Sequence, residues 1–577
     1  GRLEGGLTAA QILYPLMQCT DVFFLRADVC QLGVDQRKVN MLAREYCDYV
    51  PKIKRKPVIL SHHMLFGLKA GQEKMSKSDP DSAVFMEDTA EDVRRKIMAA
   101  YCPTTADSAA ASEAKEEEED AGKVSMHLVE DDLKNPCLDY IQNIILCPPD
   151  STFTAGGDTY SNFEQVKAAF LGGKITETEL KEGLIEELNK LLEPVRHHFT
   201  TNERAKDLFA KVLQFKKESS SSSIKSEFRK LDLVKSGRIP SDKQRHVVFA
   251  PLPNSQPTLQ SAMDTLDQIK AAGDDGKAVI LYLSDWSAMV QNACDADVKP
   301  IQAFYDLFVC CLKTLGVESG VMENVTVVKQ SEAILSDPSN YWISVINVGR
   351  HFRLEEVMGK AMKDADGVGK VIARLMRVAD ILALSPSSIA FPPGCTDAQV
   401  EMSLIKNYTS LPSVLAACGE DASPTLMEAS TTSLKLQMRE SEAHKTENDE
   451  YHLMDDPKVH GKSKMKKAFC EPGNISYCPP ISVTSAFLFS NAGSLTIHRS
   501  EENGGNITYK SRTEVENDFA SGALHPGDLK AEATTLMVNI LGKLVDAIKK
   551  DSNASKAAKA LKAFQKKMAK KSKGGKK

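Results

Sequence analysis

An internal repeat is the feature that most constrains how this chain can fold. The segment that begins at Gly156 is GGDTYSNFEQVKAAFLGGKITETELKEGLIEELNKLLEPV, and the one that begins at Gly504 is GGNITYKSRTEVENDFASGALHPGDLKAEATTLMVNILGKLVD. Each contains a glycine pair, an extended stretch, an amphipathic helical pattern, a short loop, Leu-Lys and a second helical pattern. Two further matches precede them in the same order: RRKIMAAYCP with SKMKKAFCEP, and YPLMQCTDVFFL with ARLMRVADILAL. The chain therefore contains two copies of one unit.

The serine run Ser219 to Ser223 has the composition of a flexible linker and marks the join between the copies. Asp380 lies far inside the second copy, whereas its counterpart Asp21 is close to the start of the first. If the copies were once equal, we expect roughly 135 residues of the first copy to be missing before Gly1. The expected segments are a truncated Rossmann-like domain (1–100), a helical domain (101–215), a linker (216–224), a second Rossmann-like domain (225–462), a second helical domain (463–550) and a lysine-rich tail (551–577).

The second copy shows which fold to expect. HVVFAP and AVILYLSD have the pattern of buried strands, and the helical pattern TLQSAMDTLDQIKAAG lies between them. Strands that alternate with helices predict an α/β fold with an open parallel sheet of the Rossmann type. The segments after Cys102 and Cys470 are mostly helical and predict a smaller domain in each copy.

Composition excludes several classes of protein. No apolar run is long enough to span a membrane, and no signal peptide is visible. The 13 cysteines form no C-x-x-C pair, which favours reduced thiols in a cytoplasmic protein and no bound metal. An acidic insert from Glu113 to Asp120 is expected to be a solvated loop, and we assign it no function.

A lysine- and serine-rich loop, KMSKS from Lys74 to Ser78, lies between two ordered elements. Asp79-Pro80 is a helix-opening pair, and Thr89 begins a capping-box pattern for the next helix. Such a loop can bring two ammonium groups to a multiply charged anion, and phosphate is the obvious candidate. The alternative is an ordinary solvated turn.

Three motifs in order give the chain a family resemblance. KMSKS resembles the second signature loop of class I aminoacyl-tRNA synthetases. YPLMQCTDVFFLRADVCQLGVDQRKVNMLAREY, from Tyr14, resembles the amino-acid pocket and ribose-binding region of eukaryotic-type tyrosyl-tRNA synthetases. HPGDLK, from His525, is similar to part of the anticodon-binding domain of the same enzymes. The tandem form resembles the double-length tyrosyl-tRNA synthetases of some protozoa.

The spacing of Tyr14, Gln18 and Asp21 puts all three on one face of a helix. The resemblance implies that Asp21 accepts the phenol hydroxyl of tyrosine, while Tyr14 and Gln18 hold its amino group. A pocket with such an acceptor rejects phenylalanine, and this enzyme family is a well-known example of that discrimination. Taken alone, Tyr14 and Gln18 have the pattern of ordinary helix residues.

The segment LGVDQRK supplies the expected nucleotide contacts. Gly33 permits close backbone approach to a ligand, and Asp35 can accept both ribose hydroxyls. By resemblance, Gln36 contacts the carboxyl region of the amino acid and Met64 packs near adenine. The alternatives are a strand-end turn capped by Asp35 and a core methionine at Met64.

The resemblance implies a two-step reaction that consumes ATP. The tyrosine carboxylate attacks the α-phosphate, pyrophosphate leaves, and the tyrosyl group then moves to the 3′ end of tRNA(Tyr). Lys74 and Lys77, carried with Met75, Ser76 and Ser78, would neutralise the charge that develops on pyrophosphate. Mg2+ is expected to accompany ATP, held mainly by phosphates and water. The family's first signature, His-x-Gly-His, would precede Gly1, so we expect this chain to be an incomplete catalyst.

The second copy lacks the residues of this chemistry. LPNSQPTLQS, from Leu252, stands in the first signature region without a histidine. Ala373 and Arg377 replace Tyr14 and Gln18, Thr396 aligns with Asp35, and Asp380 alone is retained. No lysine- and serine-rich loop lies between Leu426 and His460. We expect this sheet to be a structural partner only.

The helical domains show the opposite distribution. His525 and Asp528 are the predicted anticodon contacts, with Asp528 accepting hydrogen bonds from guanine; the first copy has Glu179 there. Asp528 could instead simply cap its helix. Ala155 and Asn503 stand where the family has an aromatic residue that stacks on the base.

One catalytic site and one anticodon site on opposite copies predict a pseudo-dimer within a monomeric chain. Its partners would be tyrosine, ATP and tRNA(Tyr), without a membrane. The competing hypotheses are a tryptophanyl-tRNA synthetase and a non-catalytic tRNA-binding or scaffold protein. The segment from Lys556 to Lys577 holds ten lysines and no acid, which suggests either tRNA backbone contacts or a solvated tail.

Overall fold

The computed structural model describes two units. One comprises Pro15–Ser226, and the other comprises Gly1–Tyr14 with Glu227–Lys577. Below, the first copy means residues 1–226 and the second copy means residues 227–577; Gly1–Tyr14 of the first copy belong to the same unit as the second copy. The residues described are 7–50, 55–70, 72, 75, 79–104, 134–221, 244–272, 276–317, 320–359, 367–391, 396–418, 423–437, 446–489, 493–501 and 504–574.

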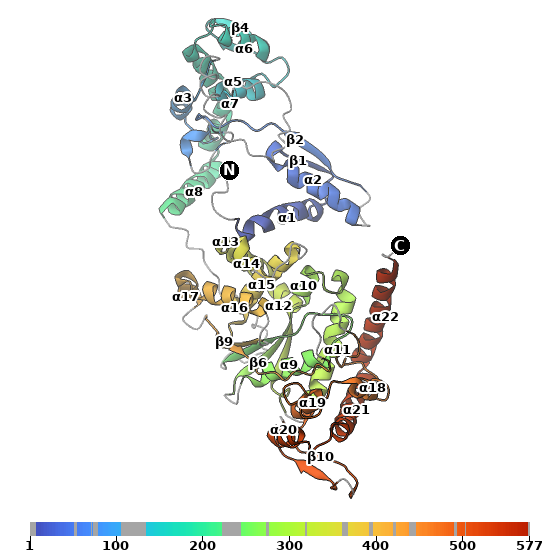
Figure 1. Cartoon of the computed structure of the whole chain (residues 1–577). Helices are drawn as coiled ribbons and strands as arrows, with labels where there is room; N and C mark the ends of the chain where they lie inside the picture. Colours follow the sequence, from blue (N-terminus) through green and yellow to red (C-terminus); the bar gives the residue numbers. More distant parts are fainter. Residues whose placement is uncertain are drawn as a thin grey trace. The chain divides into compact units, whose positions relative to one another are not determined.

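The second copy contains the predicted parallel sheet (Figure 1). Its five strands have the order β7-β6-β5-β8-β9, and every neighbouring pair is parallel. The direction of winding reverses between β5 and β8, where α/β sheets of this kind bind ligands. The strands are β5 (Arg245–Phe249), β6 (Ala278–Leu283), β7 (Val325–Lys329), β8 (Ser388–Phe391) and β9 (Thr425–Glu428).

Helices cover both faces of this sheet, which explains why all six residues of β6 are buried. One face packs against α9 (Leu259–Lys270) and α11 (Val298–Gly316). The other packs against α13 (Pro338–His351) and α15 (Val368–Leu384). Shorter helices and turns complete the layer: α10 (Asp285–Val290), η5 (Ala293–Ala296), α12 (Gln330–Ser336), α14 (Leu354–Met358), α16 (Thr396–Thr409) and α17 (Pro412–Cys418).

The first copy repeats the end of this sheet. Helix α1 (Ala9–Phe24) leads to β1 (Val29–Gly33), which pairs in parallel with β2 (Val58–His62). Val29 and Val58 are each 53% exposed, in contrast to β6 and β8 of the second copy, whose residues are all buried. The elements between and after these strands are η1 (Val34–Gln36), α2 (Arg37–Tyr46), η2 (Cys47–Tyr49) and η3 (Pro80–Ser82).

The helical domains have the same order of elements, apart from η4 (Ile141–Ile145) in the first copy, as the sequence repeat predicts. In each, a short hairpin turns at a glycine pair in the left-handed region, with φ of 62° and 82° at Gly156 and Gly157 and 88° and 72° at Gly504 and Gly505. The first copy has α3 (Ala90–Met98), α5 (Pro136–Tyr140), η4 (Ile141–Ile145), β3 (Phe153–Ala155), β4 (Asp158–Tyr160), α6 (Phe163–Leu171), α7 (Glu177–Thr201) and α8 (Glu203–Ser221). The second has α18 (His460–Lys467), α19 (Pro479–Phe487), β10 (Leu495–Ile497), β11 (Ile507–Tyr509), α20 (Arg512–Ser521), α21 (Pro526–Lys550) and α22 (Ser552–Gly574).

A buried lysine–aspartate pair, called here the lysine clasp, occurs at the same place in both copies. Lys96 Nζ lies 2.7 Å from Asp88 Oδ2, and Lys464 Nζ lies 2.7 Å from Asp455 Oδ2. Each ammonium also donates to a backbone carbonyl, that of Ala83 or Glu450. The side chains of both pairs are 3% and 9% exposed. The clasp ties the loop after the sheet to the first helix of the helical domain.

Two expectations about connecting segments meet the structure differently. The segment 216–224, predicted to be a linker, is helical as far as Ser221, because α8 continues into the serine run and serine lowers helix propensity only modestly. The acidic insert Glu113 to Asp120 lies outside the described residues.

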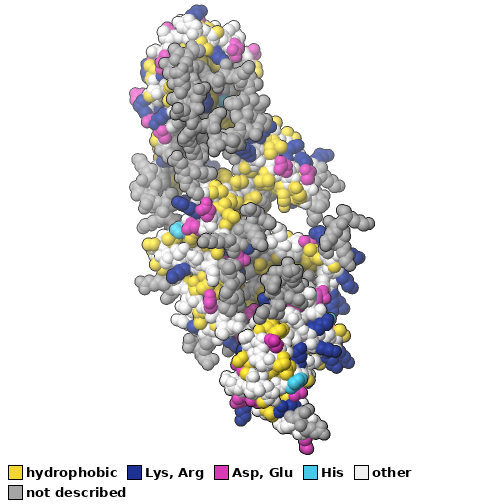
Figure 2. All heavy atoms as spheres, in the orientation of Figure 1, with side chains coloured by type: hydrophobic (Ala, Val, Ile, Leu, Met, Phe, Trp, Pro, Cys, Tyr) yellow, Lys and Arg dark blue, Asp and Glu magenta, His cyan; other side chains and the backbone are white. Residues whose placement is uncertain are grey.

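Among the helices that the structure describes, none is long and apolar enough to cross a bilayer. Figure 2 shows Lys and Arg side chains gathered over α18 and α22 of the second copy.

Candidate active site and anticodon site

The predicted tyrosine contacts lie on α1. Tyr14 is 67% exposed, and Gln18, one turn further along, is half-buried. The Nε2 of Gln18 donates to Gln36 Oε1 at 2.9 Å, whereas its Oε1 is buried without a partner among the described residues. Asp21 is exposed, and its carboxylate makes no hydrogen bond or ion pair with any described residue. The hydroxyl acceptor predicted for tyrosine is therefore open.

The predicted ribose contacts follow the end of β1. Asp35 and Gln36 belong to η1, and Gln36 Nε2 donates to Asp35 Oδ2 at 2.9 Å. Gln18, Gln36 and Asp35 thus form one hydrogen-bonded chain. Gly33 pairs in register with His62 of β2, so this chain lies at the carboxyl ends of parallel strands, the usual place for a nucleotide.

Gly33 is needed here for space. A Cβ on Gly33 would collide with Met64 Sδ and lie 2.8 Å from Asp35 Oδ1. The sequence prediction assigned this free space to a ligand, whereas in the structure Met64 and Asp35 occupy it. Met64 is half-buried, consistent with either of its predicted roles.

The ends of the KMSKS loop are fixed by contacts that the sequence did not reveal. Lys69 Nζ lies 2.6 Å from Asp79 Oδ2, and this hydrogen bond lowers the pKa of Asp79. Asp79 also caps η3, as the Asp-Pro pair predicts. Met75 packs against the helical-domain core. The predicted catalytic residues Lys74, Ser76, Lys77 and Ser78 lie outside the described residues.

His63 is a further residue that sequence reasoning missed. Its Nε2 lies 2.7 Å from Asp139 Oδ1 of α5, and Asp139 Oδ2 accepts the backbone N–H of Phe66 at 2.8 Å. These bonds fix the chain between β2 and the KMSKS loop against the helical domain. No local motif signals them, because Asp139 lies 76 residues beyond His63.

The predicted anticodon residues begin α21. His525 caps the helix through its Nδ1, which accepts the N–H of Gly527 at 3.0 Å. Asp528 is half-buried, and its carboxylate has no partner among the residues that the structure describes. In the first copy, Glu179 Oε2 accepts the N–H and the hydroxyl of Thr176 at 2.9 and 2.7 Å. The alternative that Asp528 caps the helix is wrong, since His525 does so. Ala155 is buried in β3, and Asn503 is outside the described residues.

Comparison with known proteins gives one consistent family. A family model described as tRNA synthetases class I (W and Y) matches residues 1–193. Tyrosine–tRNA ligase 2, cytoplasmic, of Arabidopsis thaliana is 30% identical over 608 aligned residues, which cover 97% of this chain and 76% of the relative. A tyrosyl-tRNA synthetase of Leishmania major, solved with tyrosinol, has a TM-score of 0.77 at 36% identity, covering 99% of this chain and 77% of that one.

The chain belongs to the tyrosyl-tRNA synthetase family. The predicted resemblance, fold class and enzyme class are therefore confirmed. Arabidopsis thaliana tyrosine–tRNA ligase 1, cytoplasmic, is more similar over a shorter stretch, 50% identical over 217 residues, which cover 36% of this chain and 49% of that relative.

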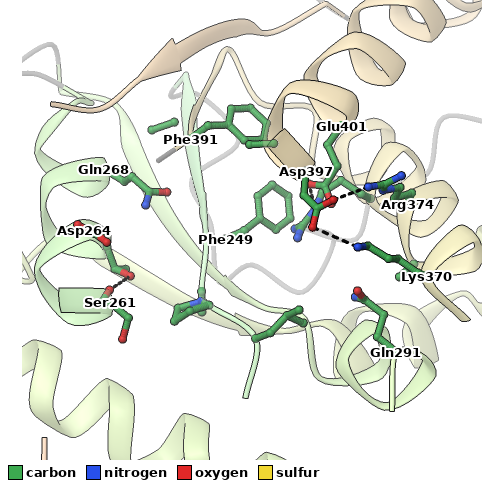
Figure 3. A pocket seen from close by; sticks show the side chains of 18 residues that line it. Phe249, Ser261, Asp264, Gln268, Gln291, Lys370, Arg374, Phe391, Asp397 and Glu401 are labelled. Atoms are coloured by element: carbon green, nitrogen blue, oxygen red, sulfur yellow. Dashed lines mark hydrogen bonds and ion pairs between the residues drawn. The ribbon is translucent and has the colours of Figure 1, made fainter. Parts of the chain in front are cut away.

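In the second copy of this synthetase, a cavity of about 290 Å³ lies at the carboxyl ends of β5 and β8 (Figure 3). Its cationic side chains pair with two of its carboxylates, those of Asp397 and Glu401. Arg374 Nη2 lies 2.5 Å from Asp397 Oδ1, and Lys370 Nζ lies 3.3 Å from Asp397 Oδ2. Arg377, at the position of Gln18, pairs with Glu401 at 3.1 Å and stacks 3.6 Å from the ring centroid of Phe249. The side chain of Thr396 is outside the described residues.

Asp380, at the position of Asp21, is fully buried and saturated with donors from the synthetase itself. Tyr282 and Tyr341 donate their hydroxyls to Asp380 Oδ1 at 3.0 and 2.8 Å, and Gln330 Nε2 donates to Oδ2 at 2.8 Å. Burial raises the pKa of Asp380 to about 7. In the second copy, the carboxylate that corresponds to the phenol acceptor Asp21 is therefore already bonded to two tyrosine side chains of the protein.

The described residues contain no cluster of three or more His, Cys, Asp or Glu side chains suited to a metal ion.

Proposed function

We propose that the protein is a tyrosine–tRNA ligase in which the first copy activates tyrosine and the second copy reads the anticodon of tRNA(Tyr). The observation that carries this proposal is the contrast between Asp21 and Asp380. The carboxylate of Asp21 has no partner among the described residues, whereas that of Asp380 accepts three bonds from the chain. Of these two carboxylates, only that of the first copy is open to an incoming phenol.

The remaining contacts of the first copy fit the same substrate. In the proposed site, Asp21 accepts the phenol hydroxyl, Tyr14 and Gln18 hold the amino group, and Gln36 orients the carboxylate. The Gln18 Oε1, unpaired among the described residues, supports this role, because a buried amide oxygen favours a donor such as an ammonium group. Asp35 accepts the ribose hydroxyls, Gly33 allows the backbone to approach the nucleotide, and Met64 packs near adenine.

The chemistry is transfer of the tyrosine carboxylate to the α-phosphate of ATP, with release of pyrophosphate. Lys74 and Lys77 would offset the charge that builds on the leaving group more strongly in the transition state than in the ground state. ATP supplies the phosphate, and Mg2+ accompanies it. The salt bridge of Lys69 with Asp79 supports the start and end of this loop.

The anticodon role is assigned to the second copy because the Asp528 carboxylate has no described partner, whereas that of Glu179 is bonded to Thr176. One active site and one anticodon site then serve one tRNA, so the two copies would act as a pseudo-dimer in a monomeric chain. A cytoplasmic location agrees with the cysteine pattern and with the names of the Arabidopsis relatives.

Tyrosine-dependent exchange of pyrophosphate into ATP by the full-length protein tests the first half of this proposal. Asp21→Ala should lower kcat/KM for tyrosine by about 10- to 100-fold, which corresponds to a lost charged hydrogen bond of roughly 1.5–3 kcal/mol. Asp380→Asn is the matched control and should leave exchange unchanged. Exchange that depends on Asp380, or that is driven by tryptophan, would contradict the proposal.

A further inference from the structure

Helix α22 has two opposite faces in the structure. Ala554, Ala557 and Leu561 are at most 5% exposed and belong to the core that also contains α11 and α21. The other side exposes lysines, with Ala560 and Ala563 among them. We call Lys556, Lys559, Lys566, Lys567 and Lys570 the lysine face; all five are exposed.

The lysine face has no charge partner within the part of the chain that the structure describes. None of its five ammonium groups makes an ion pair with a described residue; Lys571, outside the face, pairs with Asp295 at 2.9 Å. No acidic residue occurs in α22. Surfaces of ordinary soluble domains mix both signs of charge, so a one-sign face of this length favours an anionic partner.

The first copy provides a matched comparison. Helix α8 stands at the same place in the repeat, yet its first turns carry both signs of charge, with Glu203 and Asp207 beside Lys206. The lysine face therefore accompanies the copy that retains the anticodon motif, and the copy without that motif lacks it.

The lysines of α18 lie between the anticodon motif and α22. Lys530, the last residue of HPGDLK, donates to the carbonyls of Lys466 and Ala468 at the end of α18. The start of α18 lies beside α22, because His460 and Lys562 line one cavity of about 350 Å³, which Glu447, Asp455 and Asp456 also line. Between these points, α18 exposes Lys462, Lys466 and Lys467. Lys and Arg side chains can be followed over both helices in Figure 2.

We propose that the lysine face of α22, continued by the lysines of α18, binds the phosphate backbone of the tRNA whose anticodon Asp528 reads. This inference rests on the proposed function and extends it from one base to a track along the nucleic acid. An anionic membrane is a poorer partner, because a membrane-bound amphipathic helix inserts its apolar face, and here that face is buried in the core.

The test is the salt dependence of tRNA binding by the full-length protein. Fluorescence anisotropy with a labelled tRNA(Tyr) transcript would be measured from about 50 to 200 mM salt. The double variant Lys559→Gln with Lys566→Gln should make the fall of log K with log salt less steep by about 1.5, at roughly 0.7–0.9 for each lost phosphate contact. The matched control, Lys206→Gln with Lys211→Gln on α8, should leave the slope unchanged.

Other results of these measurements would contradict the proposal that the lysine face binds tRNA. The proposal is overturned if the double variant on α22 has the same salt slope as the wild type. It is also overturned if the double variants on α22 and α8 reduce the slope equally. A third contrary result is a double variant on α22 that still binds tRNA like the wild type but no longer binds phosphatidylserine vesicles. Asp528→Ala separates this inference from the proposed function: it should leave the slope intact and abolish the preference for tRNA(Tyr) over a transcript with another first anticodon base. If that preference survives while the α22 pair lowers the slope, the anticodon assignment fails and the lysine face stands.

Discussion

Glu179 and Asp528 occupy the same place in the two helical domains, yet only Glu179 is engaged in holding its own helix. Its carboxylate closes a capping box with Thr176, whereas His525 caps α21 and leaves the Asp528 carboxylate without a described partner. Asp21 and Asp380 show the reverse relationship in the sheets. In each of these two pairs, the carboxylate of one copy accepts hydrogen bonds from its own copy. The carboxylate of the other copy has no partner among the described residues.

Asp528→Ala is expected to lower kcat/KM for tRNA charging by about 10- to 100-fold, because a carboxylate that binds a base is worth roughly 1.5–3 kcal/mol. Tyrosine-dependent pyrophosphate exchange should be unchanged. Steady-state aminoacylation of a tRNA(Tyr) transcript measures the first quantity and the exchange assay the second.

Glu179→Ala is the matched control, with the opposite profile. Loss of the capping box should lower the free energy of unfolding by about 1 kcal/mol and leave charging of tRNA unchanged. A charging defect in this variant as large as that of Asp528→Ala would contradict the division of labour between the copies.

Asp380→Asn should flatten the pH dependence of stability in the second copy. The pKa of Asp380 is about 7 in the fold against an ordinary 3.8, so its contribution is fully present below pH 3.8 and is lost as pH rises through 7. At about 1.4 kcal/mol per pKa unit, up to about 4 kcal/mol is involved. Thermal unfolding at pH 5 and pH 8 should show a smaller difference in Tm for the variant than for the wild type.

Lys464→Ala is expected to destabilise the second copy by about 3–5 kcal/mol, because it leaves the buried carboxylate of Asp455 without its counter-charge. Lys462→Ala on the exposed side of α18 should change the free energy of unfolding by less than about 0.5 kcal/mol. Urea unfolding measures both. Equal effects of the two substitutions would show that the clasp is not a significant source of stability.

The pseudo-dimer proposal predicts the mass in solution. Size-exclusion chromatography with light scattering should give the mass of one chain for the full-length protein at micromolar concentration. A stable particle of twice that mass would count against a monomeric pseudo-dimer.

Local patterns in the sequence were sufficient for much of the fold. The capping box at Thr89, the strands at Val247 and Ile280, and the paired hairpins and helices of the repeat all depend on residues close together in the chain. The serine run misled because its composition is that of a linker, whereas the helix before it simply continues.

Contacts between distant residues account for what the sequence did not reveal. Tyr282, Gln330 and Tyr341 reach Asp380 from 98, 50 and 39 residues away, so the retained aspartate looked like a remnant of the active site. The lysine clasp was missed for a related reason. Lysine is an exposed residue in most proteins, and only the fold shows that Lys96 and Lys464 are buried.

The phenols of Tyr282 and Tyr341 act on Asp380 as a permanently bound ligand would. The stability that a protein gains from a ligand depends on the free ligand concentration, rising as the logarithm of that concentration above the Kd, but a group that is part of the chain is present at high local concentration from the moment of folding. The second sheet should therefore keep the same melting behaviour in cells starved of tyrosine as in cells rich in it, and remain a constant support while the occupancy of the other half rises and falls.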